Sequence, residues 1–221
     1  MISDSLDLLS RLKSLGYDNP SRDPWWWPES GTFTVVVGAI LTQNANWERV
    51  EISLENLRNE GLLSPEHLAE YPAASLEGLI RPSGFHTAKG RNLRELSRRV
   101  IEEFGSFETF RETVERDWLL ARRGIGPETA DAILNYACYR EAFVVDSYTA
   151  RLLETLGYEL SNYDEVQAWM LEGLAGREEE LFPGLPSAQV YARAHGMVVE
   201  YCKVNRKGRA IVVEPLLNSQ E

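Results

Sequence analysis

The stretch Leu119-Leu-Ala-Arg-Arg-Gly-Ile-Gly-Pro-Glu-Thr-Ala-Asp-Ala-Ile133 predicts two helices joined by a tight turn made of Gly124, Ile125 and Gly126. Its two glycines allow a close turn and a close approach to another molecule, and Pro127 suits the first position of the second helix. The amides at that helix start point outward, where they can bind phosphate. From this stretch alone, a phosphate-binding hairpin and a plain connection between packed helices are about equally good interpretations.

Apolar residues recur at helical spacing along nearly the whole chain, as in Leu93, Leu96, Val100 and Ile101. Helix starts are predicted at N-cap or first-turn residues, namely Asn46 before Trp47, Ser64-Pro65, Asp117 before Trp118, and Pro186. Helix ends are predicted at glycines that follow apolar runs, namely Gly16, Gly61, Gly105 and Gly157. We therefore predict an all-α protein of about ten helices.

Four segments depart from the plain helical pattern. The β-branched residues 35–37 are compatible with a buried strand or a buried helix, and helical neighbours favour the helix. Residues 19–31 hold three prolines around three tryptophans, which predicts a loop. A second loop is expected over residues 177–186, and the tail after Arg206 is expected to be irregular, with residues 211–213 packed on the body.

Length and cysteine content limit the classes of protein. At 221 residues, the chain fits one domain or two small ones. Cys138 and Cys202 make no CxxC pair and no metal-ligand spacing, so buried thiols are expected and no metal site is predicted. Neither a signal peptide nor a membrane span is evident, and we expect a cytoplasmic, nucleoid-associated protein without a membrane partner.

The net charge of -11 counts against binding to nucleic acid, because DNA-binding proteins usually carry excess Lys and Arg. Basic residues nevertheless cluster at Arg81, Lys89, Arg91, Arg94, Arg98 and Arg99, at Arg122 and Arg123, and at Lys203, Arg206, Lys207 and Arg209. These clusters are either a DNA-contacting surface or solvated helix faces. A hairpin that holds phosphate through backbone amides does not need a basic protein.

After the hairpin, the segment Ala142-Phe-Val-Val-Asp-Ser-Tyr-Thr-Ala-Arg151 places Asp146 at the end of an apolar run and before a helix. Taken alone, Asp146 is best interpreted as an N-cap that accepts the amides of Tyr148 or Thr149. The hairpin and the Val-Asp with an Arg five residues later together resemble the helix-hairpin-helix DNA glycosylases of the endonuclease III superfamily.

In that family the matching Asp is catalytic, so the resemblance implies this role for Asp146. Such a carboxylate stabilises the oxocarbenium-like sugar as the base leaves, and orients or deprotonates the attacking water. The family commonly has Thr-His after this Asp, whereas this chain has Ser147-Tyr148. The difference implies a divergent branch.

Two further segments are similar to the family's DNA-inserting elements. Residues 38–46 resemble a helix end whose Gln, here Gln43, fills the space left by an extruded nucleotide. Residues 81–89 resemble a loop that bears an apolar wedge, here Phe85, beside a Gly and before a Lys that opens a helix. Removing a base from the stack requires such insertions, but a buried-core role is a close alternative for Phe85.

The resemblance covers roughly residues 30–203. It implies one helical domain at 30–140, and a second formed by 1–29 and 141–221, with double-stranded DNA entering a cleft between them. The implied partner is a duplex with a damaged base, bound by a monomer.

Lyase relatives carry a Schiff-base Lys two residues after the second hairpin glycine, where this chain has Glu128. A carboxylate cannot form an imine, which predicts base removal without strand cleavage. Many relatives also hold an iron-sulfur cluster through Cys thiolates near the C-terminus. This chain lacks those cysteines, so no cofactor is expected.

The tryptophans Trp25, Trp26 and Trp27, with the segments around Gln43 and Phe85 and with residues 192–196, resemble the 3-methyladenine DNA glycosylase III branch. Stacking and cation–π attraction suit positively charged alkylated purines. The resemblance also places Lys203 beside the base pocket, where it would be neutralised, paired with a carboxylate such as Glu200, or carbamylated. A surface lysine is a slightly better interpretation.

Sequence therefore predicts a DNA glycosylase without lyase activity, acting on alkylated purines such as 3-methyladenine. One alternative is a glycosylase for uracil, mismatched thymine or mispaired adenine. Another is a DNA-binding adaptor that keeps the hairpin and performs no chemistry.

Overall fold

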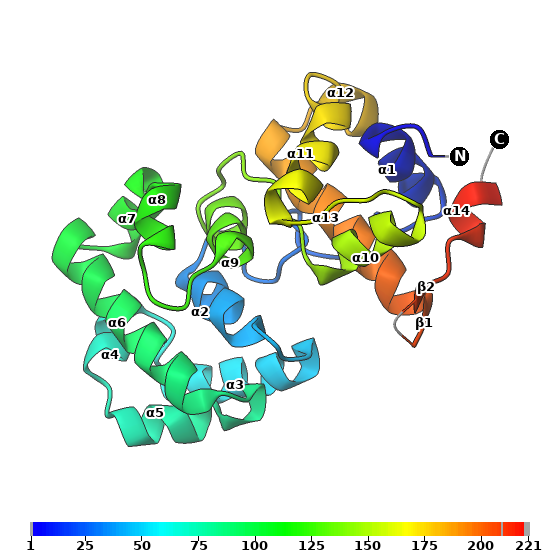
Figure 1. Cartoon of the computed structure of the whole chain (residues 1–221). Coiled ribbons are helices and arrows are strands. Elements are labelled where there is room, and N and C mark those ends of the chain that lie inside the picture. The colour runs from blue at the N-terminus through cyan, green and yellow to red at the C-terminus, as the bar shows by residue number, and fades with distance from the viewer. Residues whose placement is uncertain (1, 209, 219–221) are drawn as a thin grey trace. The chain divides into compact units, whose positions relative to one another are not determined.

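The computed structural model describes residues 2–208 and 210–218 of the chain, which form helices and one short β-hairpin (Figure 1). The predicted all-α class is confirmed. Two compact units are present: a central unit, Glu29–Cys138, and a terminal unit built from Met1–Pro28 and Tyr139–Glu221.

The helices of the central unit are α2 (Phe33–Thr42), α3 (Trp47–Asn59), α4 (Pro65–Glu70), α5 (Ala73–Leu79), the 3-10 turn η1 (Arg81–Ser83), α6 (His86–Phe104), α7 (Phe107–Thr113), α8 (Arg116–Leu120), α9 (Pro127–Ala132) and the π-helical turn η2 (Ile133–Ala137). The elements of the terminal unit are α1 (Ser5–Ser14), α10 (Ser147–Thr155), α11 (Tyr163–Leu174), α12 (Glu178–Leu181), α13 (Ser187–Val204), β1 (Arg206–Lys207), β2 (Ala210–Ile211) and α14 (Glu214–Asn218).

Helix α2 is the core of the central unit. Residues 33–41 are all buried, and the side chains of Val35, Val36 and Val37 are fully shielded from solvent. A helix that is apolar on every side must be surrounded by other elements, and α3, α6, α9 and η2 contact it. The predicted buried helix is therefore confirmed, because tertiary packing outweighs the β-propensity of three valines.

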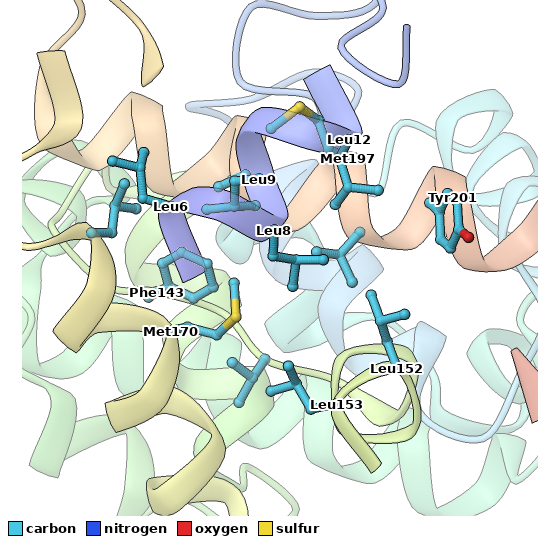
Figure 2. Packing of buried hydrophobic residues seen from close by; sticks show 14 of the residues in the cluster. Leu6, Leu8, Leu9, Leu12, Phe143, Leu152, Leu153, Met170, Met197 and Tyr201 are labelled. Atoms are coloured by element: carbon cyan, nitrogen blue, oxygen red, sulfur yellow. The ribbon is translucent and has the colours of Figure 1, made fainter. Parts of the chain in front are cut away.

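Four leucines of α1 anchor the core of the terminal unit, as Figure 2 shows. They pack with Met170 of α11 and Met197 and Tyr201 of α13, all buried. Each such side chain stabilises the fold by roughly 1.5–3 kcal/mol relative to exposure. An N-terminal helix is thus an integral part of a core made mainly by the C-terminal third.

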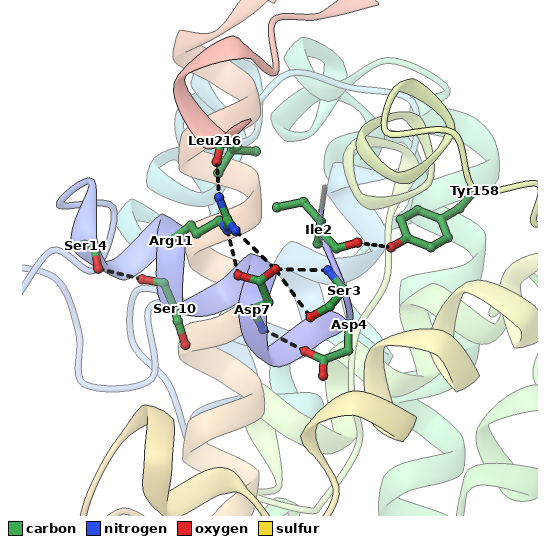
Figure 3. A network of polar contacts seen from close by, with 9 residues as sticks. All are labelled: Ile2, Ser3, Asp4, Asp7, Ser10, Arg11, Ser14, Tyr158 and Leu216. Carbon is green, nitrogen blue, oxygen red and sulfur yellow. Dashed lines mark hydrogen bonds and ion pairs between the residues drawn. The ribbon is translucent and has the colours of Figure 1, made fainter. Parts of the chain in front are cut away.

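A polar network joins the two ends of the chain within the terminal unit (Figure 3). The buried Arg11 guanidinium pairs with Asp7, 2.6 Å from Nε to Oδ1, and donates from Nη1 to the Leu216 carbonyl of α14 at 3.0 Å. The Tyr158 hydroxyl donates to the Ile2 carbonyl at 2.8 Å. These bonds hold α1, α14 and the residues after α10 together.

Most predicted helix boundaries are confirmed. Asn46, Ser64 and Pro186 are N-caps, and the Ser64 hydroxyl accepts the His67 amide at 3.4 Å. Positive φ values of 85, 68, 78 and 94° occur at the four predicted stops, Gly16, Gly61, Gly105 and Gly157. Asp117 is confirmed as a first-turn position, because α8 begins at Arg116 after the N-cap Glu115, and the Asp117 charge complements the helix dipole.

Two segments are more regular than predicted. The expected loop at 177–186 contains α12, and the expected irregular tail contains a hairpin that pairs Arg206 with Ile211, followed by α14. These elements are too short for a periodic signal. Ile211 is buried, as expected, and Arg209 lies outside the described residues.

Candidate active site and DNA interface

The glycine turn between α8 and α9 depends on Gly124. Its φ of +77° is left-handed, and a Cβ there would lie 2.0 Å from Asn92 Nδ2. Gly126 has an ordinary extended φ of −95°, and a Cβ at this position would project into open space, so the expectation that its glycine shapes the turn is wrong. Ile125 is buried between the two exposed glycines, which fixes the turn to the core and leaves its backbone accessible.

Gln43 lies at the end of α2 and contacts this turn. Its Nε2 donates to the Gly124 carbonyl at 2.8 Å and to Thr129 Oγ1 at 2.9 Å. The structure therefore brings the predicted helix-end Gln and the predicted hairpin together across 81 residues of sequence.

Phe85 is 68% exposed, so the buried-core alternative for this residue is wrong. It caps α6 in a left-handed conformation with φ of +47°, directly after Gly84 at φ +70°. Left-handed backbone is costly for a phenylalanine and is found mostly where the surrounding structure imposes it at functional sites.

Lys89, by contrast, does not belong to an exposed basic cluster. It is 3% exposed, and its Nζ donates to the Leu41 carbonyl at 2.8 Å and the Ser83 carbonyl at 2.7 Å. Burial lowers the pKa of this amine to about 8. Its position in the pattern Lys89, Leu93, Leu96, Val100 marks it as a member of the apolar face, a signal that sequence reasoning missed.

Asp146 is the N-cap of α10, as its local sequence predicts. Oδ1 accepts the amides of Tyr148 and Thr149 at 2.9 Å each, and Thr149 completes a reciprocal capping box. All of these bonds go to one oxygen. The other, Oδ2, lies 3.7 Å from Nε2 of His195 on α13.

The environment keeps the Asp146 carboxyl ionised. Burial on its own raises its pKa, but the adjacent His195 imidazole and the Thr149 amide and hydroxyl outweigh burial and hold the pKa below its usual value. Its side chain is 15% exposed, so a reactant can reach it. Sequence reasoning assigned His195 no role of its own, although its spacing with the buried Tyr191, Val198 and Cys202 marks it as inward-facing.

Trp26 lies flat against α13. A Cβ at Gly196 would fall 2.4 Å from the indole Cγ, so this close contact requires glycine. The indole meets the His195 ring edge-on at 5.4 Å between centroids, and its Nε1 donates to Glu200 Oε1 at 3.3 Å. The backbone of Trp26 is left-handed, with φ of +67°.

The three adjacent tryptophans differ in burial. Trp27 is 8% exposed, while Trp25 and Trp26 are half-buried. Trp25 packs on the ring of Tyr139, 4.2 Å between centroids. Trp26 therefore presents a half-buried indole beside His195.

Lys203 is exposed, and its Nζ lies 3.8 Å from Glu200 Oε1. This is the predicted pairing with a carboxylate. Its Nζ lies 5.9 Å from the centre of the Trp26 ring. Arg22 also pairs with Glu200, at 2.9 Å. One carboxylate thus receives two cations and the Trp26 indole.

Glu128, the position that holds a lysine in lyase relatives, is exposed in the first turn of α9. Within residues 2–208 and 210–218, no group of three His, Cys, Asp or Glu side chains is arranged to hold a metal ion. In the same described part, none of the helices has the length and apolar character needed to cross a membrane.

A helix-hairpin-helix with an exposed glycine turn, followed along the chain by an ionised carboxylate at a helix start, is the arrangement expected of a helix-hairpin-helix base-excision protein. The model for the HhH-GPD superfamily of base excision DNA repair proteins matches residues 37–174, and the chain belongs to this family.

Known proteins support this assignment over most of the chain. A protein of Methanocaldococcus jannaschii described as a DNA repair glycosylase is 38% identical over 187 residues, which is 80% of each chain. The solved structure of H. pylori 3-methyladenine DNA glycosylase bound to 1,N6-ethenoadenine is 39% identical, with a TM-score of 0.88, over 93% of this chain and 100% of that one. A structure of endonuclease III with DNA shares the fold, with a TM-score of 0.74 at 20% identity over 98% and 94%.

Proposed function

We propose that this protein is a DNA glycosylase that removes alkylated purines, with 3-methyladenine as its principal substrate, and that it has no lyase activity. The observation that carries the proposal is the ionised carboxylate of Asp146, which uses one oxygen for the helix cap and presents the other beside His195. Because the cap occupies only Oδ1, Oδ2 remains available for chemistry.

Excision breaks the N-glycosyl bond, and the electron pair leaves with the base. The Asp146 carboxylate stabilises the positive charge that develops on the sugar, and it takes a proton from the water that adds to the anomeric carbon. An N-alkylated purine that is already cationic departs as a neutral base, so no separate general acid is required. His195, at 3.7 Å, holds the carboxylate in its ionised form.

The aromatic surface of Trp25 and Trp26 supports the choice of substrate. Large indole faces bind flat purines by stacking, and bind cationic ones more tightly through the ring quadrupole. The name of the H. pylori relative, a 3-methyladenine DNA glycosylase bound to 1,N6-ethenoadenine, points to the same class of lesion.

Glu128 supports the proposed absence of lyase activity, because a carboxylate at this position cannot form the imine through which lyases cleave the strand. We propose further that the enzyme acts as a monomer and without a cofactor. Cys138 and Cys202 are both buried and cannot supply the set of about four thiolates that an iron-sulfur cluster takes.

The test is a panel of duplexes that each carry one lesion: 3-methyladenine, 1,N6-ethenoadenine, uracil, a thymine mismatch, or adenine opposite an oxidised guanine. We expect strand breaks on alkylated purines only after hot alkali, and these should form at least about a hundredfold more slowly with Asp146→Asn. Breaks without alkali would show lyase activity. Preference for uracil or a mismatch would favour the alternative glycosylase, and no abasic sites on any duplex would favour the adaptor.

A further inference from the structure

Lys89 of the central unit joins the two segments predicted to insert into DNA. Leu41 lies in the last turn of α2, and Ser83 ends η1, so their carbonyls have no partner within their own helices. A single buried ammonium on α6 donates to both, at 2.8 and 2.7 Å. It also places positive charge at the negative end of the α2 dipole.

Each of these carbonyls lies two residues before a predicted DNA-inserting side chain. Gln43 follows Leu41 and is bonded to the hairpin through Gly124 and Thr129. Phe85 follows Ser83 in a left-handed backbone and is exposed. The ammonium therefore fixes the distance between the starting points of both side chains.

Stability alone does not explain a lysine at this position. Burying an ammonium costs free energy, and an apolar residue of similar volume generally packs as well or better. The lowered pKa of Lys89, about 8, reflects this cost. Unlike an apolar side chain, the Lys89 ammonium can hold two backbone segments at a defined spacing through hydrogen bonds.

We propose that Lys89 is a positioning residue, which holds Gln43 and Phe85 in the relative geometry needed to enter the duplex together when a nucleotide is extruded. The proposal rests on the proposed function, because it assumes that both side chains insert.

The primary test uses Lys89→Met, which keeps an unbranched side chain, shorter by one atom, and removes both hydrogen bonds. Val100→Ala is the matched control, because it destabilises the buried face of the same α6 helix farther along. Both variants are examined at a temperature where each is folded by circular dichroism. Extrusion is followed by the fluorescence of 2-aminopurine placed beside the lesion, and excision by single-turnover rates at saturating protein.

We expect Lys89→Met to lower the excision rate by about tenfold or more and to reduce the fluorescence rise, with affinity for undamaged duplex changed less than threefold. Val100→Ala should leave all three quantities near wild type. If Lys89→Met does not fold, Lys89→Gln, which reaches one carbonyl at a time, replaces it and should give a smaller loss in the same direction. Wild-type extrusion and excision in the folded lysine variant would overturn the proposal.

A variant that already carries Gln43→Ala and Phe85→Ala shows whether Lys89 acts by positioning these two side chains or by stabilising the fold in general. If Lys89 acts through these two side chains, adding Lys89→Met to that variant should change the excision rate by less than twofold. An additive loss would overturn the proposal. A wild-type protein that neither extrudes nor excises any lesion would instead overturn the proposed function, and wild-type excision by the Gln43 and Phe85 variants would refute their insertion.

Discussion

Asp146→Asn separates the two roles of the carboxylate. The asparagine oxygen can accept the same amide bonds from Tyr148 and Thr149, now 2.9 Å each, and Asn and Asp are similarly good N-caps. We therefore expect the free energy of unfolding to change by less than about 1 kcal/mol. Catalysis loses a full charge: at about 5 Å and an effective dielectric constant of about 20, that charge contributes about 3 kcal/mol to stabilising the sugar cation.

Because about 1.4 kcal/mol corresponds to tenfold in rate, the single-turnover excision rate should fall by at least about a hundredfold. Binding to a lesion duplex should be unchanged or slightly tighter, since repulsion with phosphate is lost. The assay is hot-alkali cleavage with excess protein, and urea unfolding of the same preparation gives stability. Asn162→Ala, which removes the cap of α11 in the same unit, controls for the loss of a cap alone. Near-normal excision with lowered stability would refute the catalytic role.

Three further results are expected. Gly126→Val should weaken binding to damaged and undamaged duplex alike in anisotropy titrations, because the valine side chain would project into the open space where phosphate would approach. Its melting temperature should stay near that of the wild type, whereas Gly124→Ala should lower the melting temperature. Trp26→Ala should impair discrimination of alkylated from normal bases in competition excision assays with little change in affinity for undamaged DNA. Burial, with a smaller effect of the Asp146 charge, raises the pKa of Cys202 to about 12, so above pH 9 this thiol keeps its proton in the folded state and loses it in the unfolded state. Lys89, whose pKa burial lowers to about 8, has the opposite effect on stability in this range. The stability of the wild type relative to Cys202→Ala should therefore fall by about 1.4 kcal/mol per pH unit in urea titrations between pH 9 and 10.5.

Local signals in the sequence were sufficient for the fold class and the family. Periodic apolar residues and glycine stops predicted the helices, and the spacing of the hairpin and Asp146 identified the family before any contact was known. Those features depend on neighbours within a few residues. Short elements such as α12 and α14 lack a full period of apolar residues, so they were predicted as loop and irregular tail.

Contacts between residues distant in sequence could not be predicted from the sequence. The Asp146–His195 pair joins α10 to α13, and the Lys89 bonds join α6 to α2 and η1, so neither follows from local sequence. Helical spacing does place Lys89 and His195 on buried faces, but lysine and histidine are usually interpreted as surface or functional side chains. Conversely, Gly126 looks like a turn glycine because it is next to a proline, while the left-handed backbone that requires glycine lies at Gly124.

The structure also changes the meaning of the acidic net charge. Arg99 pairs with Glu95, Glu102 and Glu103, and Arg122 pairs with Glu103, so these arginines are already neutralised by neighbours on the protein. Lys89 is buried and is removed from the surface altogether. Fewer side-chain cations are thus available for phosphate than the sequence suggests. Binding through the exposed backbone around Ile125 escapes this limit, because amide groups need no counterion and cannot be neutralised by nearby carboxylates. A DNA glycosylase can therefore be acidic when the hairpin backbone makes the phosphate contacts that lysines and arginines make in other DNA-binding proteins.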